Sequence, residues 1–205
     1  MNSTYFVTGI GTDVGKTIVA AILTEALGAD YWKPVQAGDL ENSDSLKVKH
    51  LISNDKTVFH PSGFSLSQPM SPHAAACIDG KDIKVEKLKR PATDNNLIIE
   101  GAGGLLVPLN NTETILDLIN PADKIILVSR HYLGSINHTL LSLEVLRSRG
   151  LECFGIIFNG DENKSSEEII LKMAGTRVLG RIGNEPYFDK NVIKEYAEEF
   201  KKCFN

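Results

Sequence analysis

The chain has 205 residues, of which 42% are apolar and 23% charged, an ordinary composition for one globular α/β domain spanning residues 1–205. The net charge of -4 disfavours nucleic acid as a partner, because a phosphate backbone selects basic surfaces. No apolar run approaches the ~18 residues of a membrane helix, and the start of the chain lacks signal-peptide character. We therefore expect no membrane association and a cytoplasmic location.

Short apolar runs alternate with helical patterns along the chain. The predicted strands cover residues 4–8, 30–35, 97–100, 124–129 and 153–158, and the predicted helices cover residues 16–27, 135–149 and 191–204. Strands that are apolar almost throughout are typical of parallel sheets covered on both faces. The alternation predicts a doubly wound, mostly parallel sheet with helices on both faces. Residues 57–89 show no long periodic pattern and are predicted to form a connection with short helices.

A glycine-rich segment, residues 9–17, follows the first predicted strand and leads directly into a helix. Glycines permit a tight turn with N–H groups aimed inward, and the helix start adds partial positive charge. Lys16 can reach the β- and γ-phosphates of a nucleotide, and the Thr17 hydroxyl can ligate Mg²⁺. The usual P-loop pattern requires glycine where this chain has Ile10, so the motif is a variant. Nucleotide binding is favoured over a purely structural turn.

Charged residues near other predicted strands are candidates for a ligand crevice, which lies at the carboxyl ends of the strands in such sheets. Glu100 ends a strand, and its carboxylate suits Mg²⁺; the alternative is a solvated strand end. Lys33 ends the second strand and can offer a fixed positive charge to a developing anion. Asp44 precedes a predicted helix, where position alone favours an N-cap. The start of the helix at Ser135 is a candidate anion site.

These segments together resemble the dethiobiotin synthetases, the ATP-dependent carboxylases of biotin synthesis. The matching motifs run from residue 5 to about residue 185 and are FVTGIGTDVGKT (6–17), WKPVQAG (32–38), NSD (42–44), SPHAAA (71–76), EGAGGLLVPL (100–109), LGSINH (133–138) and FNG (158–160). No single motif is decisive, but their order is specific. The phosphate loop of that family has the same displaced glycine.

The resemblance implies a cyclo-ligase that uses ATP and Mg²⁺ to join CO₂ to 7,8-diaminopelargonic acid. One amine forms a carbamate, and ATP phosphorylates the carbamate to a mixed anhydride. The second amine then closes the ring, which gives dethiobiotin, ADP and phosphate. Catalysis of such a step depends chiefly on positioning and charge neutralisation.

The resemblance also assigns roles to individual residues. Lys33 is the expected catalytic lysine, and Lys16 is expected to hold the phosphates. The Mg²⁺ ion is expected at Thr17, Asp44 and Glu100. The nucleotide is expected to contact Thr12, Asp13, Val14, Gly15, Lys16, Thr17, Asp44, Glu100, Gly101, Ala102 and Gly103, and its base is expected at Asn159, Gly160, Gly183, Asn184 and Glu185.

Substrate contacts are implied for Lys33 and Ala37 and for the helix start at Gly134, Ser135 and Asn137. In the family that helix belongs to the other subunit, so a homodimer with shared sites is expected. The chain departs from the family at Ala37, where many relatives have serine or threonine. A hydroxyl contact to the amine or carbamate of the substrate is therefore missing.

Two other interpretations are disfavoured. A cobyrinate synthetase domain of the amidotransferase type usually needs a glutaminase domain with a cysteine nucleophile, and the cysteines at 77, 153 and 203 lie in no such motif. A ParA-like switch ATPase typically carries an additional lysine early in the phosphate loop, whereas no lysine precedes Lys16 in this loop.

Overall fold

Seven strands form the central sheet of the computed structural model, which describes residues 2–204. Their order across the sheet is β4-β2-β6-β1-β7-β8-β9, and every neighbouring pair is parallel. The strands are β1 (Thr4–Gly9), β2 (Asp30–Trp32), β4 (Phe59–His60), β6 (Leu97–Gly104), β7 (Lys124–Arg130), β8 (Cys153–Asn159) and β9 (Val178–Ile182). The predicted parallel sheet is confirmed.

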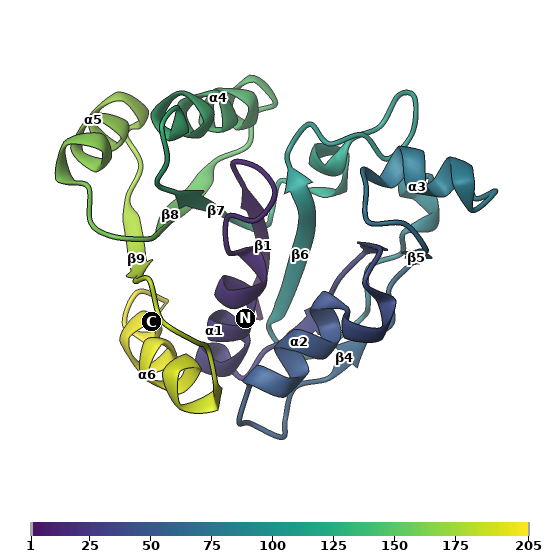
Figure 1. Cartoon of the computed structure of the whole chain (residues 1–205), viewed down its shortest axis with the longest axis horizontal. Helices are drawn as coiled ribbons and strands as arrows, with labels where there is room; N and C mark the ends of the chain where they lie inside the picture. The colour runs from purple at the N-terminus through teal and green to yellow at the C-terminus, as the bar shows by residue number, and fades with distance from the viewer. Residues whose placement is uncertain (1, 205) are drawn as a thin grey trace.

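Helices cover both faces of this sheet, as Figure 1 shows. On one face lie α1 (Lys16–Leu27), α2 (Asp44–Leu51) and α6 (Lys190–Lys201), and on the other lie α4 (Ser135–Ser148) and α5 (Lys164–Ala174). The short α3 (Pro72–Ile78) lies against a separate two-stranded sheet of β3 (Val35–Ala37) and β5 (Phe64–Leu66). Short 3₁₀ helices occupy Leu40–Asn42, Val85–Lys87 and Ile115–Leu118. Between residues 2 and 204, no helix combines the length and apolar character needed to span a bilayer.

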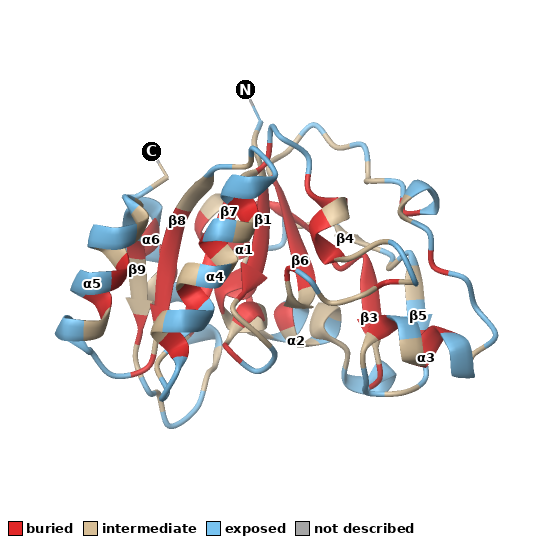
Figure 2. Ribbon diagram, turned by 90° about the horizontal axis from the view of Figure 1, so that it is seen from above, coloured by how far each residue is buried: buried red, intermediate tan, exposed pale blue. Residues whose placement is uncertain are grey.

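Side chains of the central strands alternate between two cores, which explains their nearly continuous apolar sequences. In β1, Val7 packs in the core that contains α1 and α6, whereas Phe6 packs in a core on the opposite face. In β6, Ile98 and Ile99 divide between the two cores in the same way. Figure 2 shows these strands buried along most of their length. Functional polar groups must therefore gather beyond the carboxyl ends of the strands.

The predicted strand 30–35 is confirmed only for residues 30–32; its continuation to residue 35 is wrong, because β2 ends at Trp32 and β3 belongs to the small sheet. Pro34 has no N–H for a ladder, and its carbonyl accepts a hydrogen bond from Gly63 at 2.9 Å. The buried indole of Trp32 donates to the carbonyl of Pro61 at 3.1 Å. Lys33 consequently lies in the turn between the two sheets.

Strand β6 continues to Gly104, beyond the predicted end at Glu100. Gly104 pairs with Gly9 of β1. A Cβ at Gly101 would meet the Phe6 side chain at 3.3 Å, so glycine keeps these strands close together. Glu100 is therefore held inside a strand rather than at its free end.

The apolar sequence patterns are weaker at the edges of the fold than at its centre. The strands β4, β5 and β9 and the helix α5 were not predicted; β4 has only two residues, and β9 carries Gly180 and Arg181 within its apolar pattern. The last predicted helix extends too far, because α6 ends at Lys201. Phe204, beyond that end, packs edge-on against the ring of Tyr5.

Candidate active site

The phosphate loop, residues 9–17, joins β1 to α1 at the carboxyl end of the sheet. Gly15 precedes α1 with a φ of 100°, and a Cβ there would lie 2.4 Å from Nδ2 of Asn159. Ile10 continues the pairing of β1, because its N–H donates to the carbonyl of Val128 at 3.1 Å. The close approach occurs instead at Gly9, where a Cβ would lie 2.5 Å from the Val14 side chain. Glycine is thus needed at position 9 and not at position 10.

Lys16 begins α1 and turns back onto its own loop. Its Nζ donates to the carbonyl of Gly11 at 2.7 Å. Burial, together with the positive charge of Lys33, lowers the pKa of Lys16 from 10.5 to about 8. A buried ammonium group in this state is stabilised by an approaching anion such as a phosphate.

Lys33 lies at the centre of an ion-pair cluster beside the loop. Its Nζ donates to Oδ2 of Asp44 at 2.7 Å, to Oε1 of Glu100 at 3.0 Å and to the carbonyl of Gly101 at 2.9 Å. These bonds engage all three ammonium protons. Burial alone would lower the pKa of Lys33, but the charges of Glu100 and Asp44 outweigh burial and raise it. The cluster therefore holds a fixed positive charge out of water.

Two hydroxyl groups complete the surroundings of Glu100. Thr17 Oγ1 donates to Oε1 at 2.9 Å, and the Tyr31 hydroxyl donates to Oε2 at 2.7 Å. Burial, followed by the charge of Glu100, raises the pKa of Tyr31 well above its ordinary value, so the hydroxyl remains a donor. The elements α1, β2 and β6 thus meet at this carboxylate, and α2 joins them through the ion pair between Asp44 and Lys33.

Asp44 is the first residue of α2, but it does not cap that helix. The side chain of Ser43 caps α2 by accepting a hydrogen bond from the N–H of Leu46 at 3.4 Å. The interpretation of Asp44 as an N-cap is therefore wrong. Its carboxylate pairs with Lys33 instead, and although burial opposes the charge, Lys33 keeps the pKa of Asp44 below its ordinary value. Gln36 fixes its backbone, because Oε1 accepts a hydrogen bond from the Asp44 N–H at 3.1 Å.

A cavity of about 760 Å³ opens in front of the cluster. The predicted site residues that line it are Thr12, Asp13, Gly15, Lys16, Thr17, Lys33, Ala37, Asp44, Glu100, Ala102 and Gly103. Its walls also carry apolar groups that sequence reasoning missed, Val35, Met70 and Val107. The cavity therefore combines a charged end with apolar walls that suit an alkyl chain.

A second group of predicted residues lies at the ends of β8 and β9, on the other side of the loop. Asn159 reaches the loop directly, because its Nδ2 donates to the carbonyl of Val14 at 2.8 Å. The Tyr196 hydroxyl accepts from the N–H of Gly183 at 3.0 Å and donates to Oε1 of Glu185 at 2.6 Å. A Cβ added at Gly160 would lie 3.9 Å from Oδ1 of Asn184, so the ends of β8 and β9 are neighbours.

The predicted substrate residues at the start of α4 do not line this cavity. Gly134 precedes the helix with a φ of 104°, and Ser135 is buried. Asn137 lines a different hollow of about 310 Å³, between α4 and α5. A single chain therefore does not bring these residues to Lys33, and their role in a shared site stays a prediction.

The donor set beside Lys33 fits magnesium. Thr17, Asp44 and Glu100 offer hard oxygen ligands around a point that already attracts the Lys33 ammonium. Within residues 2–204, no group of three or more His, Cys, Asp or Glu side chains forms a metal site. Two carboxylates and a hydroxyl match an ion that completes its shell with water and phosphate oxygens.

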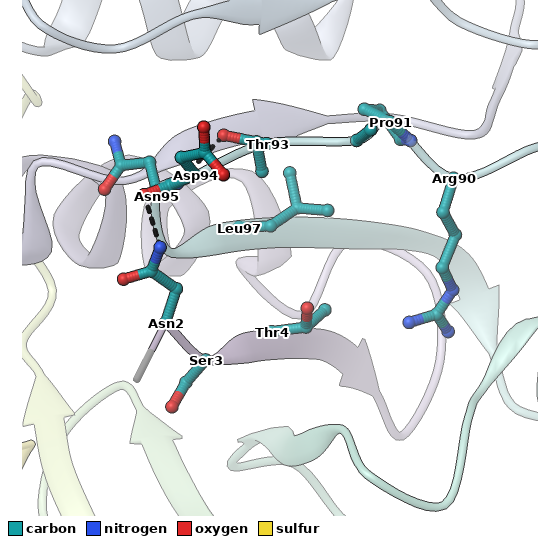
Figure 3. Close-up of a pocket in the computed structure, with 10 residues that line it drawn as sticks. Asn2, Ser3, Thr4, Arg90, Pro91, Thr93, Asp94, Asn95 and Leu97 are labelled. Carbon is teal, nitrogen blue, oxygen red and sulfur yellow. Dashed lines mark hydrogen bonds between the residues drawn. The ribbon is translucent and has the colours of Figure 1, made fainter.

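Another hollow, of about 480 Å³, lies at the opposite end of β1 and β6 (Figure 3). The Asn2 amide donates to the carbonyl of Asp94 across it. Arg90 lines the hollow near its other rim, but the Arg90 guanidinium already pairs with Asp123 at 2.6 Å. This hollow lacks the converging charges of the cavity beside the phosphate loop.

Comparison with known proteins agrees with this geometry. A family model described as an AAA domain matches residues 3–192. The ATP-dependent dethiobiotin synthetase of Christiangramia forsetii is 62% identical over 202 residues, which cover 98% of each chain. The enzyme of the same name from Cytophaga hutchinsonii is 51% identical over 195 residues, which cover 94% of each chain.

Two solved structures share the fold at low sequence identity. MinD from Pyrococcus horikoshii, complexed with Mg-ADP, has a TM-score of 0.63 at 17% identity, covering 98% of this chain and 94% of its own. A ParA family ATPase from Chlorobium tepidum has a TM-score of 0.59 at 14% identity, covering 99% and 90%. At such identities the likeness concerns the fold alone.

A parallel sheet with a phosphate loop between β1 and α1 defines a P-loop protein of the AAA-domain class. Within that class, the chain belongs to the family of ATP-dependent dethiobiotin synthetases, which are cyclo-ligases. The resemblance inferred from the ordered motifs is confirmed.

Proposed function

We propose that the chain converts 7,8-diaminopelargonic acid, CO₂ and ATP into dethiobiotin, ADP and phosphate. The observation that carries this proposal is the position of Lys33, which joins Asp44 and Glu100 in a desolvated cluster beside the phosphate loop. Family membership supports the overall reaction. The cavity supports it further, because a charged end and apolar walls suit a diamine on an alkyl chain.

The chemistry requires two anions to meet. One amine of the substrate attacks CO₂ and loses a proton, which leaves a carbamate anion. A carbamate oxygen then takes the γ-phosphoryl group of ATP, and ADP departs. The second amine attacks the carbonyl carbon of this mixed anhydride, loses a proton and expels phosphate. Repulsion between carbamate and γ-phosphate raises the barrier to this transfer, and a fixed positive charge lowers that contribution.

We assign this charge to two lysines. Lys33 lines the cavity together with both carboxylates, so its ammonium can neutralise the carbamate and the γ-phosphate. Lys16 would exchange its bond to the Gly11 carbonyl for oxygens of the β- and γ-phosphates. Thr17, Asp44 and Glu100 would hold Mg²⁺, which neutralises phosphate charge when bound.

The remaining nucleotide contacts follow the phosphate loop. Backbone N–H groups between Thr12 and Thr17 would surround the phosphates, and Gly101 to Gly103 would border them. Since Nδ2 of Asn159 is engaged by Val14, its Oδ1 remains as an acceptor that suits the exocyclic amine of adenine. Further contacts to the base are assigned to Gly160, Gly183, Asn184 and Glu185.

We also propose a homodimer in the cytoplasm. Gly134, Ser135 and Asn137 of the partner subunit would bind the carboxylate tail of the substrate at the start of α4. The exposed Tyr132 and Leu133, which precede that helix, support an interface there, because Leu133 is completely exposed in the single chain.

The test is an assay of purified protein with ATP, Mg²⁺, bicarbonate and 7,8-diaminopelargonic acid. We expect ADP release that depends on both diamine and bicarbonate, together with a product of the mass of dethiobiotin. ADP release that is indifferent to the diamine would refute the proposal and favour a ParA-like ATPase.

A further inference from the structure

The two oxygens of Glu100 have separate partners. Oε1 accepts hydrogen bonds from Thr17 and Lys33, whereas Oε2 accepts one from the Tyr31 hydroxyl at 2.7 Å. No second donor to Oε2 is found in the described part of the chain. Glu100 is 1% exposed, so bulk water cannot readily replace the tyrosine. Tyr31 is thus the hydrogen-bond partner of Oε2, the Glu100 oxygen that neither Thr17 nor Lys33 binds.

The register of the sheet places this hydroxyl. Tyr31 in β2 pairs with Ile98 of the parallel β6, and both side chains lie in the same core. Glu100 follows Ile98 by two residues and therefore points to the same face. The distance of two residues along a strand, about 6.6 Å, is roughly the length of a tyrosine side chain. The Tyr31 ring is completely buried and packs against Phe59, with ring centroids 5.6 Å apart.

We propose that Tyr31 is a positioning residue, whose hydroxyl fixes Oε2 of Glu100 so that Oε1 faces Thr17, Lys33 and an incoming cation. The inference rests on the proposed function, because it takes Glu100 to serve a Mg²⁺–nucleotide complex. Tyr31 lies outside the motif WKPVQAG and does not line the cavity. We take it to act through Glu100, to which its hydroxyl donates.

Loss of this hydroxyl leaves a buried carboxylate oxygen without a donor, a condition that costs free energy. The carboxylate then rotates in search of another donor, and Oε1 leaves its alignment with Thr17 and Lys33. The phosphate loop itself does not contact Tyr31 in the hydrogen-bond pattern of residues 2–204. Cation-dependent binding should therefore weaken, while binding of nucleotide without a cation should persist.

The experiment measures ADP affinity by calorimetry in Tyr31→Phe, without Mg²⁺ and over a range of Mg²⁺ concentrations. The variant removes one oxygen and keeps the ring packing. Mg²⁺ should increase ADP affinity, and we expect the Mg²⁺ concentration that gives half of this increase to be at least fivefold higher in the variant. ADP affinity without Mg²⁺ should stay within twofold of the wild-type value. Tyr5→Phe is the matched control, since Tyr5 is a buried tyrosine of the same sheet whose hydroxyl lies near Lys124. It should change neither quantity.

A second arm introduces Tyr31→Phe into Glu100→Gln. If Tyr31 acts through the carboxylate, the added substitution should change Mg²⁺ dependence less than twofold in that background. A Tyr31→Phe protein with wild-type Mg²⁺ dependence, or an equal loss in both backgrounds, would overturn the inference and leave the proposed reaction intact. Wild-type protein whose ADP affinity ignores Mg²⁺ would overturn the proposed function as well.

Discussion

The Nζ atom of Lys33 lies 2.7 Å from Oδ2 of Asp44, and this contact uses the last of its three protons. A carbamate can accept a hydrogen bond from Lys33 only after one of the three bonds is given up. The Asp44 side chain is 22% exposed, against 1% for Glu100, so Asp44 is the partner most able to move. A cation that binds Asp44 would release Lys33 toward the substrate, which would couple cation binding to activation of the lysine.

Replacement of Lys33 should separate binding from turnover. We expect Lys33→Ala to lower kcat by about 10²–10³, the usual cost of losing one electrostatic stabiliser. The ATP dissociation constant should change less than threefold, because the phosphate loop is untouched. Coupled turnover and calorimetry measure the two quantities, with the exposed Lys49→Ala on α2 as the control. Normal turnover in Lys33→Ala would refute the catalytic assignment.

Binding of ATP should depend on pH through Lys16. Its pKa of about 8 means that the free protein carries the ammonium below pH 8 and loses it above. Bound phosphates favour the ammonium, so binding above pH 8 must take up a proton. ATP affinity should be constant below about pH 7 and fall by up to tenfold per pH unit above about pH 8.

Calorimetry at pH 8.5 in two buffers of different ionisation enthalpy measures this proton uptake. Lys16→Ala should lose most ATP affinity and, with it, the pH dependence. An unchanged ATP affinity in that variant would contradict the assignment of the phosphate loop.

Restoring a hydroxyl at position 37 should tighten diamine binding. Ala37 lines the cavity together with Lys33, so Ala37→Ser places a donor and acceptor beside the reacting end of the substrate. One added hydrogen bond is worth about 1 kcal/mol, so the diamine KM should fall about fivefold while the KM for ATP stays constant. Steady-state kinetics measure both KM values, and an unchanged diamine KM would mean that the hydroxyl is dispensable in this protein.

A shared site can be tested by mixing two inactive variants. Lys33→Ala and Asn137→Ala should each be nearly inactive as pure proteins. After subunit exchange, half of the dimers are mixed and each has one intact site, so about a quarter of wild-type activity should return. Light scattering measures the oligomeric state alongside. A monomer, or a mixture that stays inactive, would rule out the shared site.

The centre of the fold could be predicted because its strands are buried on both faces, which leaves an unmistakable apolar pattern in β1, β7 and β8. The edge strand β9 carries Gly180 and Arg181 and gives no such signal. The break between β2 and β3 depends on Pro34, whose presence marks an end but not the start of a second sheet.

The candidate site, like the fold, could be predicted from the sequence only in part. Lys16 and Lys33 could be proposed from their positions next to strands, and Glu100 from its place after an apolar run, because parallel strands bring such residues to one edge of the sheet. The contact between Tyr31 and Glu100 could not, since it depends on the register of β2 against β6. The contact of Gln36 with the backbone of Asp44 likewise needs the three-dimensional path of the turn.

The single tryptophan of the chain, Trp32, gives the molecule a built-in fluorophore directly beside Lys33. Its indole is buried on the face of the sheet opposite Tyr31, with the N–H bound to Pro61. Emission from a shielded indole changes when its surroundings are rearranged. We expect displacement of Lys33 from Asp44 to disturb this neighbouring indole, so that the event could be timed optically in the unlabelled protein during a single turnover.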